Sequence, residues 1–189
     1  MDWVSTLFGA VIGFVSSIGI IAVQRLFDRA GKLEIYAKVV YGRSPGSHTW
    51  GFGVNGDGVL LNVPIWIEIQ NLSNSTRTLR DINLLLTYKG KELATMVQSD
   101  HTDNNGKDQY LFAEEGSYSL SIDGRKIKRI DCQFLLAAGS DSHAFDEIVL
   151  RFFDEKNRAH KYSLAHVEGD WKPKEFPRSR EWKKLKEIK

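Results

Sequence analysis

Cysteine is almost absent from this sequence, which contains only Cys132 among 189 residues. A single thiol cannot form an intrachain disulfide, so the fold must depend on a packed core, and the composition suits a reducing compartment such as the cytosol. Ile130, Cys132, Phe134 and Leu136 recur at every second position, the period of a half-buried strand. We therefore expect Cys132 to be a core residue and not a reactive thiol.

A strong excess of charge is also lacking. The sequence holds 26 basic and 24 acidic residues, which gives a formal net charge of +2. This balance excludes a surface built throughout for nucleic acid, so nucleic acid is not an expected partner. Charge is therefore expected to act only locally.

Catalytic motifs are missing as well. The five histidines are dispersed, and neither HExxH nor GxSxG nor a suitably spaced pair of carboxylates occurs. Asp141, Ser142 and His143 are adjacent, but neighbouring residues of an extended chain point to opposite faces and do not form a triad by themselves. We expect no catalytic residues and no enzymatic activity.

Metal and phosphate motifs are incomplete. The loop Ser99 to Gln109 holds Asp100, His101, Asp103 and Asp108, but it lacks the glycine and glutamate positions of a calcium-binding loop. The glycines at 51–58 precede a strand-like segment, whereas phosphate-binding loops open a helix. We expect no bound metal and no cofactor.

A long apolar run dominates what is present. From Val4 to Val23 no residue is charged, and Asp2 and Arg25 bound this run. A helix of that length spans roughly 30 Å, the thickness of the hydrocarbon core of a bilayer. A cleavable signal peptide would begin with a basic region, which is lacking here. We predict one transmembrane helix, with its juxtamembrane turn, over residues 1–31.

Basic residues flank the apolar run on one side only. Arg25, Arg29, Lys32 and Lys38 follow it, and no lysine or arginine precedes it. Basic flanks stay on the cytoplasmic side of membranes. The sequence thus predicts a single-pass protein of the cell inner membrane, with the N-terminus outside and the C-terminal domain in the cytoplasm.

Small residues form a stripe within this predicted helix. Ser5, Gly9, Gly13 and Ser17 recur every four residues, which places them on one face. Such a face lets a second helix approach closely enough for van der Waals contact in lipid. We predict helix–helix association through these residues, in a homodimer or with another transmembrane helix. The alternative is that they only reflect the composition of membrane helices.

Residues 32–168 show the two-residue apolar period of β-strands. The clearest strand runs from Val59 to Ile69, and its Pro64 favours an edge position or a bulge because proline lacks an amide hydrogen. About eight or nine strands, with turn signals between them and no helical pattern, predict an all-β domain. We expect an antiparallel sandwich or, alternatively, an eight-stranded β-barrel.

Two stretches of this domain carry a resemblance. Ile65-x-Ile67-x-Ile69-x-Asn71-x-Ser73 leads into Asp81-Ile82-x-Leu84, and a later hairpin contains Ile148-x-Leu150-x-Phe152-x-Asp154. This pattern, over about half of the domain, resembles bacterial membrane-anchored immunoglobulin-like β-sandwich proteins. The cysteine and tryptophan pair of antibody domains is lacking. The resemblance implies a shape and no activity.

Residues 169–189 form a basic C-terminal tail. Trp182, Leu185 and Ile188 recur every three residues and predict a short helix surrounded by lysines. Five residues of this tail are candidates for contact with an anionic membrane surface or a partner, namely Trp182, Lys183, Lys184, Leu185 and Lys186. The alternative is a solvated tail.

Together these features predict a membrane-anchored β-sandwich that binds an unidentified cytoplasmic protein or small ligand. One alternative is a membrane-anchored β-barrel that senses a small molecule or nucleotide, the general layout of some bacterial antiviral effectors. A continuous apolar core would favour the sandwich, and a polar cavity lined by Arg, Tyr or Trp would favour the sensor. Another is a lipid-surface protein that docks through the tail and the loop 42–58.

Overall fold

The computed structural model describes residues 13–21, 23–24, 31–40, 50–104, 107–111, 118–139, 142–177 and 181–188, without the side chains of residues 55 and 100–111. Within these ranges the chain forms fourteen β-strands and helical residues at 13–21 and 23–24. The prediction of an all-β domain is confirmed.

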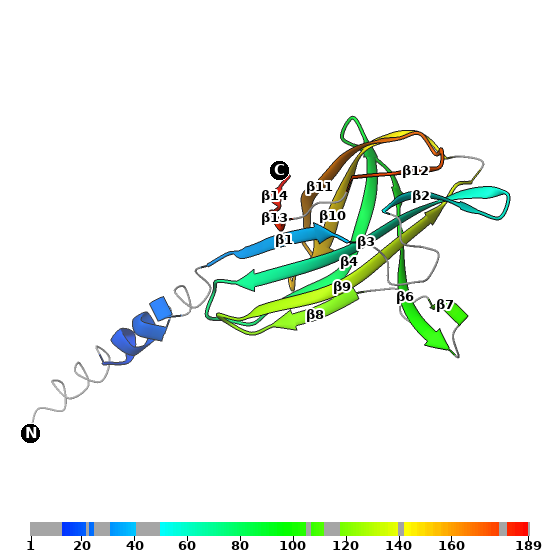
Figure 1. The fold of residues 1–189 in the computed structure, drawn as a ribbon. Coiled ribbons are helices and arrows are strands. Elements are labelled where there is room, and N and C mark those ends of the chain that lie inside the picture. Colours follow the sequence, from blue (N-terminus) through cyan, green and yellow to red (C-terminus); the bar gives the residue numbers. More distant parts are fainter. Residues whose placement is uncertain are drawn as a thin grey trace, which may run out of the picture.

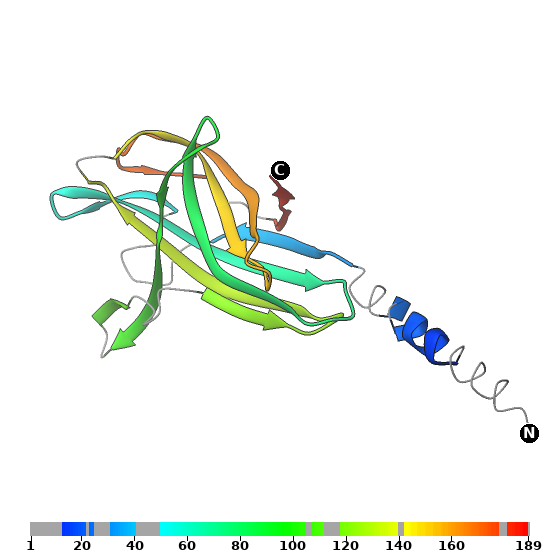
Figure 2. The ribbon, with the colours of Figure 1, turned by 180° about the vertical axis from the view of Figure 1, so that it is seen from behind.

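Two antiparallel sheets build the domain (Figure 1 and Figure 2). The first sheet contains β1 (Leu33–Val39), β2 (Gly51–Asn55), β3 (Gly58–Asn71), β6 (Val97–Asn104), β7 (Lys107–Leu111), β9 (Ile127–Ala137), β12 (Lys174–Glu175) and β13 (Lys183–Lys184). The second sheet contains β4 (Arg77–Tyr88), β5 (Lys91–Thr95), β8 (Tyr118–Ile122), β10 (Phe145–Phe153), β11 (Ala159–Gly169) and β14 (Lys186–Glu187).

Strand β3 lies in the middle of the first sheet, so the predicted edge position was wrong. It pairs with β9 along one side, and with β2 and then β1 along the other. Pro64 falls between these last two partners, because pairing with β2 ends at Asn62 and pairing with β1 begins at Ile65. Its carbonyl accepts a hydrogen bond from the amide of Val40 at 2.9 Å. The missing amide hydrogen therefore faces a gap in the ladder.

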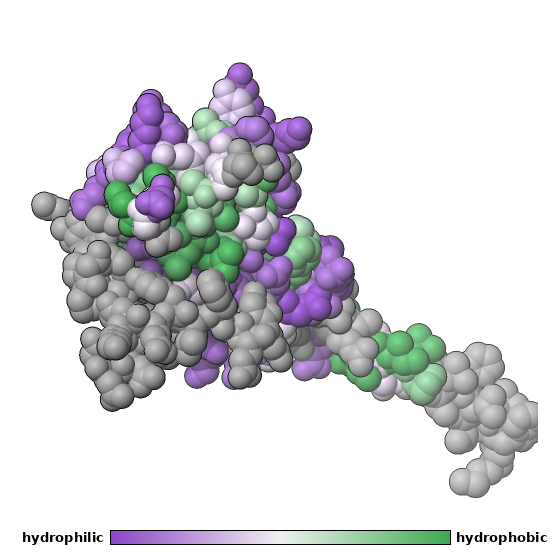
Figure 3. Space-filling view, turned by 90° about the vertical axis from the view of Figure 1, so that its right-hand side faces the viewer, coloured by the Kyte–Doolittle hydropathy of each residue, from purple (hydrophilic) through white to green (hydrophobic). Residues whose placement is uncertain are grey.

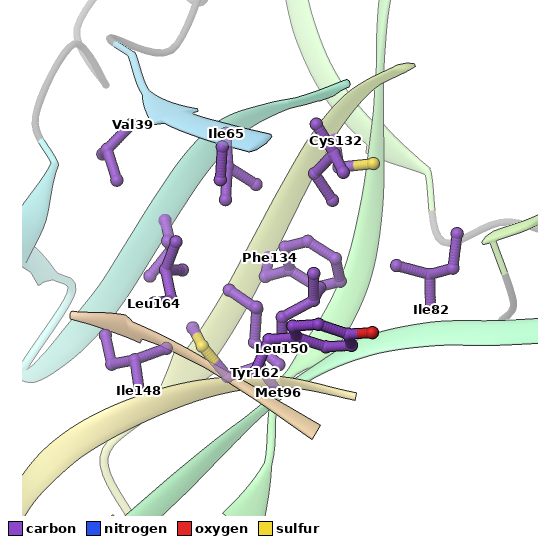
Figure 4. Close-up of a cluster of buried hydrophobic side chains, with 14 of the residues drawn as sticks. Val39, Ile65, Ile82, Met96, Cys132, Phe134, Ile148, Leu150, Tyr162 and Leu164 are labelled. Carbon is purple, nitrogen blue, oxygen red and sulfur yellow. The ribbon is translucent and has the colours of Figure 1, made fainter. Parts of the chain in front are cut away.

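One apolar core fills the space between the sheets (Figure 4). Ile65 and Phe134 of the first sheet and Ile148 and Leu150 of the second are each at most 1% exposed. Burying a large apolar side chain contributes roughly 1.5–3 kcal/mol. Cys132 is 2% exposed in the same cluster, and burial, with the nearby Asp131 charge, raises the pKa of its thiol. Its predicted place in the core is confirmed.

The chain passes directly from one sheet to the other between β5 and β6. Thr95 of β5 pairs with Leu85 in the second sheet, and two residues later Val97 of β6 pairs with Leu135 in the first. The intervening Met96 is buried and donates its amide to the carbonyl of Leu84 at 2.8 Å. This side of the core is therefore covered by continuous chain.

On the opposite side, β1 and β11 are the edges that face each other, and we call the line between them the seam. Residues 182–188, the C-terminal clasp, lie in it. β13 pairs with β1 at Tyr36 and Ala37, and β14 pairs with β11 at Tyr162 and Ser163. The clasp thus connects the two sheets.

The predicted short helix over the clasp was wrong. A helix of seven residues is marginally stable on its own, because the free-energy cost of nucleation exceeds the stabilisation that its few hydrogen bonds supply. The seam offers backbone partners on both sheets, so the clasp adopts two short strands, β13 and β14. Tertiary pairing outweighs the three-residue apolar period.

Among the described residues, no helix is long and apolar enough to span a membrane. The described helical residues, 13–21 and 23–24, cover only part of the predicted span from Val4 to Val23, and the rest lies outside the description. They form an apolar segment in Figure 3, apart from the two sheets. Phe14 and Ile20 are 68% and 66% exposed. The transmembrane helix stays a prediction.

Candidate functional site

The backbone of the clasp closes part of the seam. The amide of Leu185 donates to the carbonyl of Ile35 at 2.8 Å, and the amide of Ile188 donates to the carbonyl of Lys161 at 2.7 Å. Leu185 is 5% exposed and belongs to the core cluster. One apolar side chain thus seals the gap between the two sheet edges.

Side chains also attach the clasp to the first sheet. The ammonium of Lys184 lies 2.5 Å from the carboxylate of Glu34 on β1. Hydrogen bonds from Lys184 and then Tyr36 hold the pKa of Glu34 below its usual range. The ring of Trp182 stacks on Trp66 of β3, with 6.4 Å between the ring centroids.

Most of the predicted tail residues thus contact the protein itself. Trp182 and Lys184 contact the first sheet, and Leu185 is buried. Lys186 is exposed and pairs through its backbone with Ser163. The ammonium of Lys183 donates to the carbonyl of Leu164 on β11. Contact of these residues with a membrane or partner stays a prediction.

The predicted helix–helix stripe is described in part. Ser5 and Gly9 lie outside the described residues. The hydroxyl of Ser17 donates to the carbonyl of Gly13 at 2.7 Å, and no atom approaches a Cβ built on Gly13 within 4 Å. This face is thus open to a close neighbour, and association through it stays a prediction.

The seam continues beyond the clasp as a cavity of about 360 Å³, which we call the edge groove. Its apolar lining comes from both sheets and the segment after β12, and includes Ala37, Val39, Trp50, Leu164 and Phe176. Its other wall is the strand β11 itself, from Leu164 to Glu168. Successive side chains of a strand point to opposite faces of the sheet, so a cavity above one face is lined by every second residue. Because five consecutive residues of β11 line this cavity, the edge of the strand faces it.

Aromatic packing builds one end of the edge groove. The rings of Trp50 and Phe176 lie 4.9 Å apart between centroids, and the amide of Phe176 donates to the carbonyl of Trp50 at 2.9 Å. Gly51 permits this close approach: its φ is +136°, and an added Cβ would lie 2.3 Å from the carbonyl oxygen of Lys174. The wall is therefore fixed by backbone contacts.

Two lysines contact the edge of β11 at the rim of the groove. The ammonium of Lys183 donates to the carbonyl of Leu164 at 3.2 Å, and that of Lys174 donates to the carbonyl of Glu168 at 3.4 Å. Lys174 also lies 3.7 Å from the carboxylate of Glu168, whose side chain is 94% exposed. Within the described part of the chain, Lys183 has no carboxylate partner. The rim is therefore cationic.

A second cavity, of about 330 Å³, lies on the other side of the clasp, and we call it the polar cavity. Its charged lining includes Lys32, Glu34, Arg77, Asp154, Glu155, Arg158, Lys184 and Glu187, with His160 and Tyr162 beside them. Arg77 pairs with Glu155 at 3.2 Å and Arg158 with Asp154 at 2.6 Å. Four lysines and arginines thus face four carboxylates, so the charges balance.

Asp154 is the centre of the hydrogen bonds in the polar cavity. Its carboxylate accepts from the side chain of Arg158 at 2.7 Å and from the backbone amides of Lys156 and Arg158, both at 2.9 Å. His160 lies between Asp154, at 3.3 Å, and Glu187 of the clasp, at 2.7 Å. Burial opposes ionisation of Asp154, but the bonds from Arg158, then His160 and Lys156, outweigh it and hold its pKa well below the usual range.

Residues considered for catalysis and metal binding lie apart from both cavities or outside the description. Asp141 is outside the described residues. The hydroxyl of Ser142 accepts from the amide of Gly139 at 2.8 Å, and the carbonyl of His143 accepts from the indole of Trp171 at 2.9 Å. Within the described ranges no group of three or more His, Cys, Asp or Glu is placed to hold a metal. The side chains of residues 100–108 lie outside the described part of the chain.

The sequence did not point to the edge groove. Trp50 and Phe176 are 126 positions apart, and each appeared in the sequence as an aromatic residue in a polar segment. The only local signal was the pair of glycines around Phe52, which marks a close backbone approach. Which strand edges stay unpaired depends on the topology of both sheets.

Comparisons with family models, with curated proteins and with solved structures find no match to this chain.

We predict that Asp154→Asn lowers the free energy of unfolding at pH 7 by about 2 kcal/mol, since it removes charge-assisted hydrogen bonds from a buried group. Because the folded-state pKa is depressed, ionised Asp154 stabilises the fold above the unfolded pKa of roughly 3.9, and this stabilisation is lost as the pH falls below it. Urea denaturation followed by circular dichroism between about pH 7 and pH 2 measures both effects, and the variant should lose less stability on acidification.

Asp170→Asn is the matched control, because the side chain of Asp170 is 44% exposed and lies 3.9 Å from Lys172. It should change stability by less than about 0.5 kcal/mol. Equal effects of the two substitutions, or an unchanged acid dependence in Asp154→Asn, would contradict the assigned role of Asp154.

Proposed function

We propose that this protein is a single-pass, membrane-anchored β-sandwich module that binds a cytoplasmic partner and has no catalytic activity of its own. The edge groove is the observation that supports binding most directly. It combines an apolar lining, a strand edge and a cationic rim in a cavity of about 360 Å³, within the size range of binding sites.

The anchoring part of the proposal rests on the N-terminal sequence. Apolar side chains of the described helical residues, such as Val15 at 62% and Ile21 at 53%, are exposed to the surroundings. Apolar surface in water costs roughly 25 cal/mol per Å², and a lipid environment removes that cost. The basic residues that follow the run support a cytoplasmic domain.

The filled interior supports a β-sandwich, and we propose that this sandwich is of the immunoglobulin-like kind. The core cluster is apolar and continuous from Ile35 of the first sheet to Phe152 of the second, and the two cavities lie along the seam. A module with a filled interior binds at its surface, which agrees with the position of the edge groove.

The sensor alternative has one observation in its favour, because Arg77, Arg158 and Tyr162 line the polar cavity. A nucleotide phosphate needs uncompensated positive charge, however, and Glu155 and Asp154 already pair with the two arginines. A phosphate that binds the two arginines would have to displace both carboxylates from them. The interaction module is therefore the better supported of the two.

Membrane anchoring predicts that the full-length protein stays in the membrane pellet after washing with alkaline carbonate. It also predicts that Lys189→Cys is protected from a membrane-impermeant maleimide in intact cells and reacts after lysis. Asp2→Cys, on the opposite side of the predicted helix, is the matched control and should react in intact cells. Release into the supernatant, or labelling of Lys189→Cys from outside, would overturn the anchor or its orientation.

Dimerisation through the small-residue stripe is a separate prediction. Gly9→Leu together with Gly13→Leu should strongly reduce self-association in a membrane two-hybrid assay, because leucine keeps the helices apart. Gly19→Leu adds the same side chain off the stripe, where the space is equally open, and should leave the signal unchanged. Unchanged association in the double variant would exclude this interface.

A further inference from the structure

The strand β11 offers a backbone edge that the clasp covers only in part. Along its inner side β11 pairs with β10 from Ala159 to Gly169. Along its outer side, among the described residues, strand pairing is confined to Tyr162 and Ser163, which pair with β14. The outer edge from Leu164 to Glu168 lines the edge groove instead.

The clasp shows that the seam accommodates one extended chain. At the level of Ala37 and Ser163 the clasp lies between β1 and β11 and places Leu185 in the core. At the level of Val39 and Val167 the seam continues as the edge groove. An extended segment entering there would meet the same strand edge and an apolar floor.

The charges at the rim favour a segment with carboxylates. Lys174 and Lys183 both line the groove, and Glu168 is the only acidic residue among its described lining. Each ammonium reaches a backbone carbonyl of β11; Lys183 is exposed, and the side chain of Lys174 is 37% exposed. A carboxylate beside either ammonium forms a charge-assisted hydrogen bond.

We propose that the edge groove binds an extended segment of a partner polypeptide by adding a short strand to the outer edge of β11. Main-chain hydrogen bonds to β11 supply the pairing, an apolar side chain of the segment enters the floor formed by Val39, Leu164 and Phe176, and carboxylates of the segment pair with Lys174 and Lys183. This inference rests on the proposed binding function and identifies its ligand as an acidic, extended peptide.

Lysines at an exposed strand edge also protect it from unwanted pairing. That role alone predicts that no peptide binds at this edge. The two roles therefore give opposite results in a binding experiment.

The test uses the full-length protein in nanodiscs of zwitterionic lipid and a phage-displayed library of random heptapeptides. The proposal predicts enrichment, over empty nanodiscs, of peptides that combine acidic with β-branched residues. The affinity of an enriched peptide, measured by fluorescence anisotropy, should fall by about tenfold or more in Lys174→Glu/Lys183→Glu. Lys172→Glu/Lys128→Glu changes two exposed lysines outside the groove lining, so it alters the net charge by the same amount, and it should bind normally.

Methylation of alternate backbone amides of the enriched peptide tests the strand pairing itself, and it should abolish binding while leaving the charges intact. Absence of enrichment, equal binding by the double lysine variant, or equal binding of the methylated peptide each overturns the proposal. Binding of laurate without binding of any peptide also overturns it and assigns the groove to a single-chain amphiphile. Membrane insertion is measured separately, so failure of this inference is distinguishable from failure of the anchor.

Discussion

Free backbone edges are the constraint on which this fold depends, because each unpaired amide and carbonyl buried at a sheet edge costs free energy. The two sheets leave such edges along β1 and β11, facing each other across the seam. The C-terminal clasp satisfies both with hydrogen bonds from Leu185 to Ile35 and from Ile188 to Lys161. By filling the same gap with the side chain of Leu185, it also completes the apolar core.

The same constraint explains where binding is expected. Among the described residues, strand pairing on the outer edge of β11 ends at Ser163, and beyond it Lys183 and Lys174 donate to carbonyls of β11 beside an apolar floor. The polar cavity on the other side of the clasp differs, because its ions pair with one another around Asp154. The edge groove holds the ammonium of Lys183, which has no carboxylate partner among the described residues, whereas the charges that line the polar cavity balance.

Much of the fold could be predicted from local periodicity, since alternation alone marks β3, the hairpin of β10 and β11, and the buried place of Cys132. Periodicity failed for the clasp, where three-residue spacing predicted a helix and tertiary pairing produced strands. It also misplaced Pro64, because a gap between two partner strands is invisible in one strand's own sequence. The edge groove was out of reach for the same reason, since Trp50, Leu164 and Phe176 meet only once both sheets are assembled.

Hydrogen–deuterium exchange of the full-length protein in nanodiscs tests this account most directly, because amide protection reports backbone pairing residue by residue. The account predicts slow exchange at Leu185 and Ile188, whose amides bond to the two sheets, and fast exchange at the outward-facing amides of β11 between Ala165 and Glu168. Fast exchange throughout the last eight residues, or strong protection along that stretch of β11 without a bound partner, would contradict it.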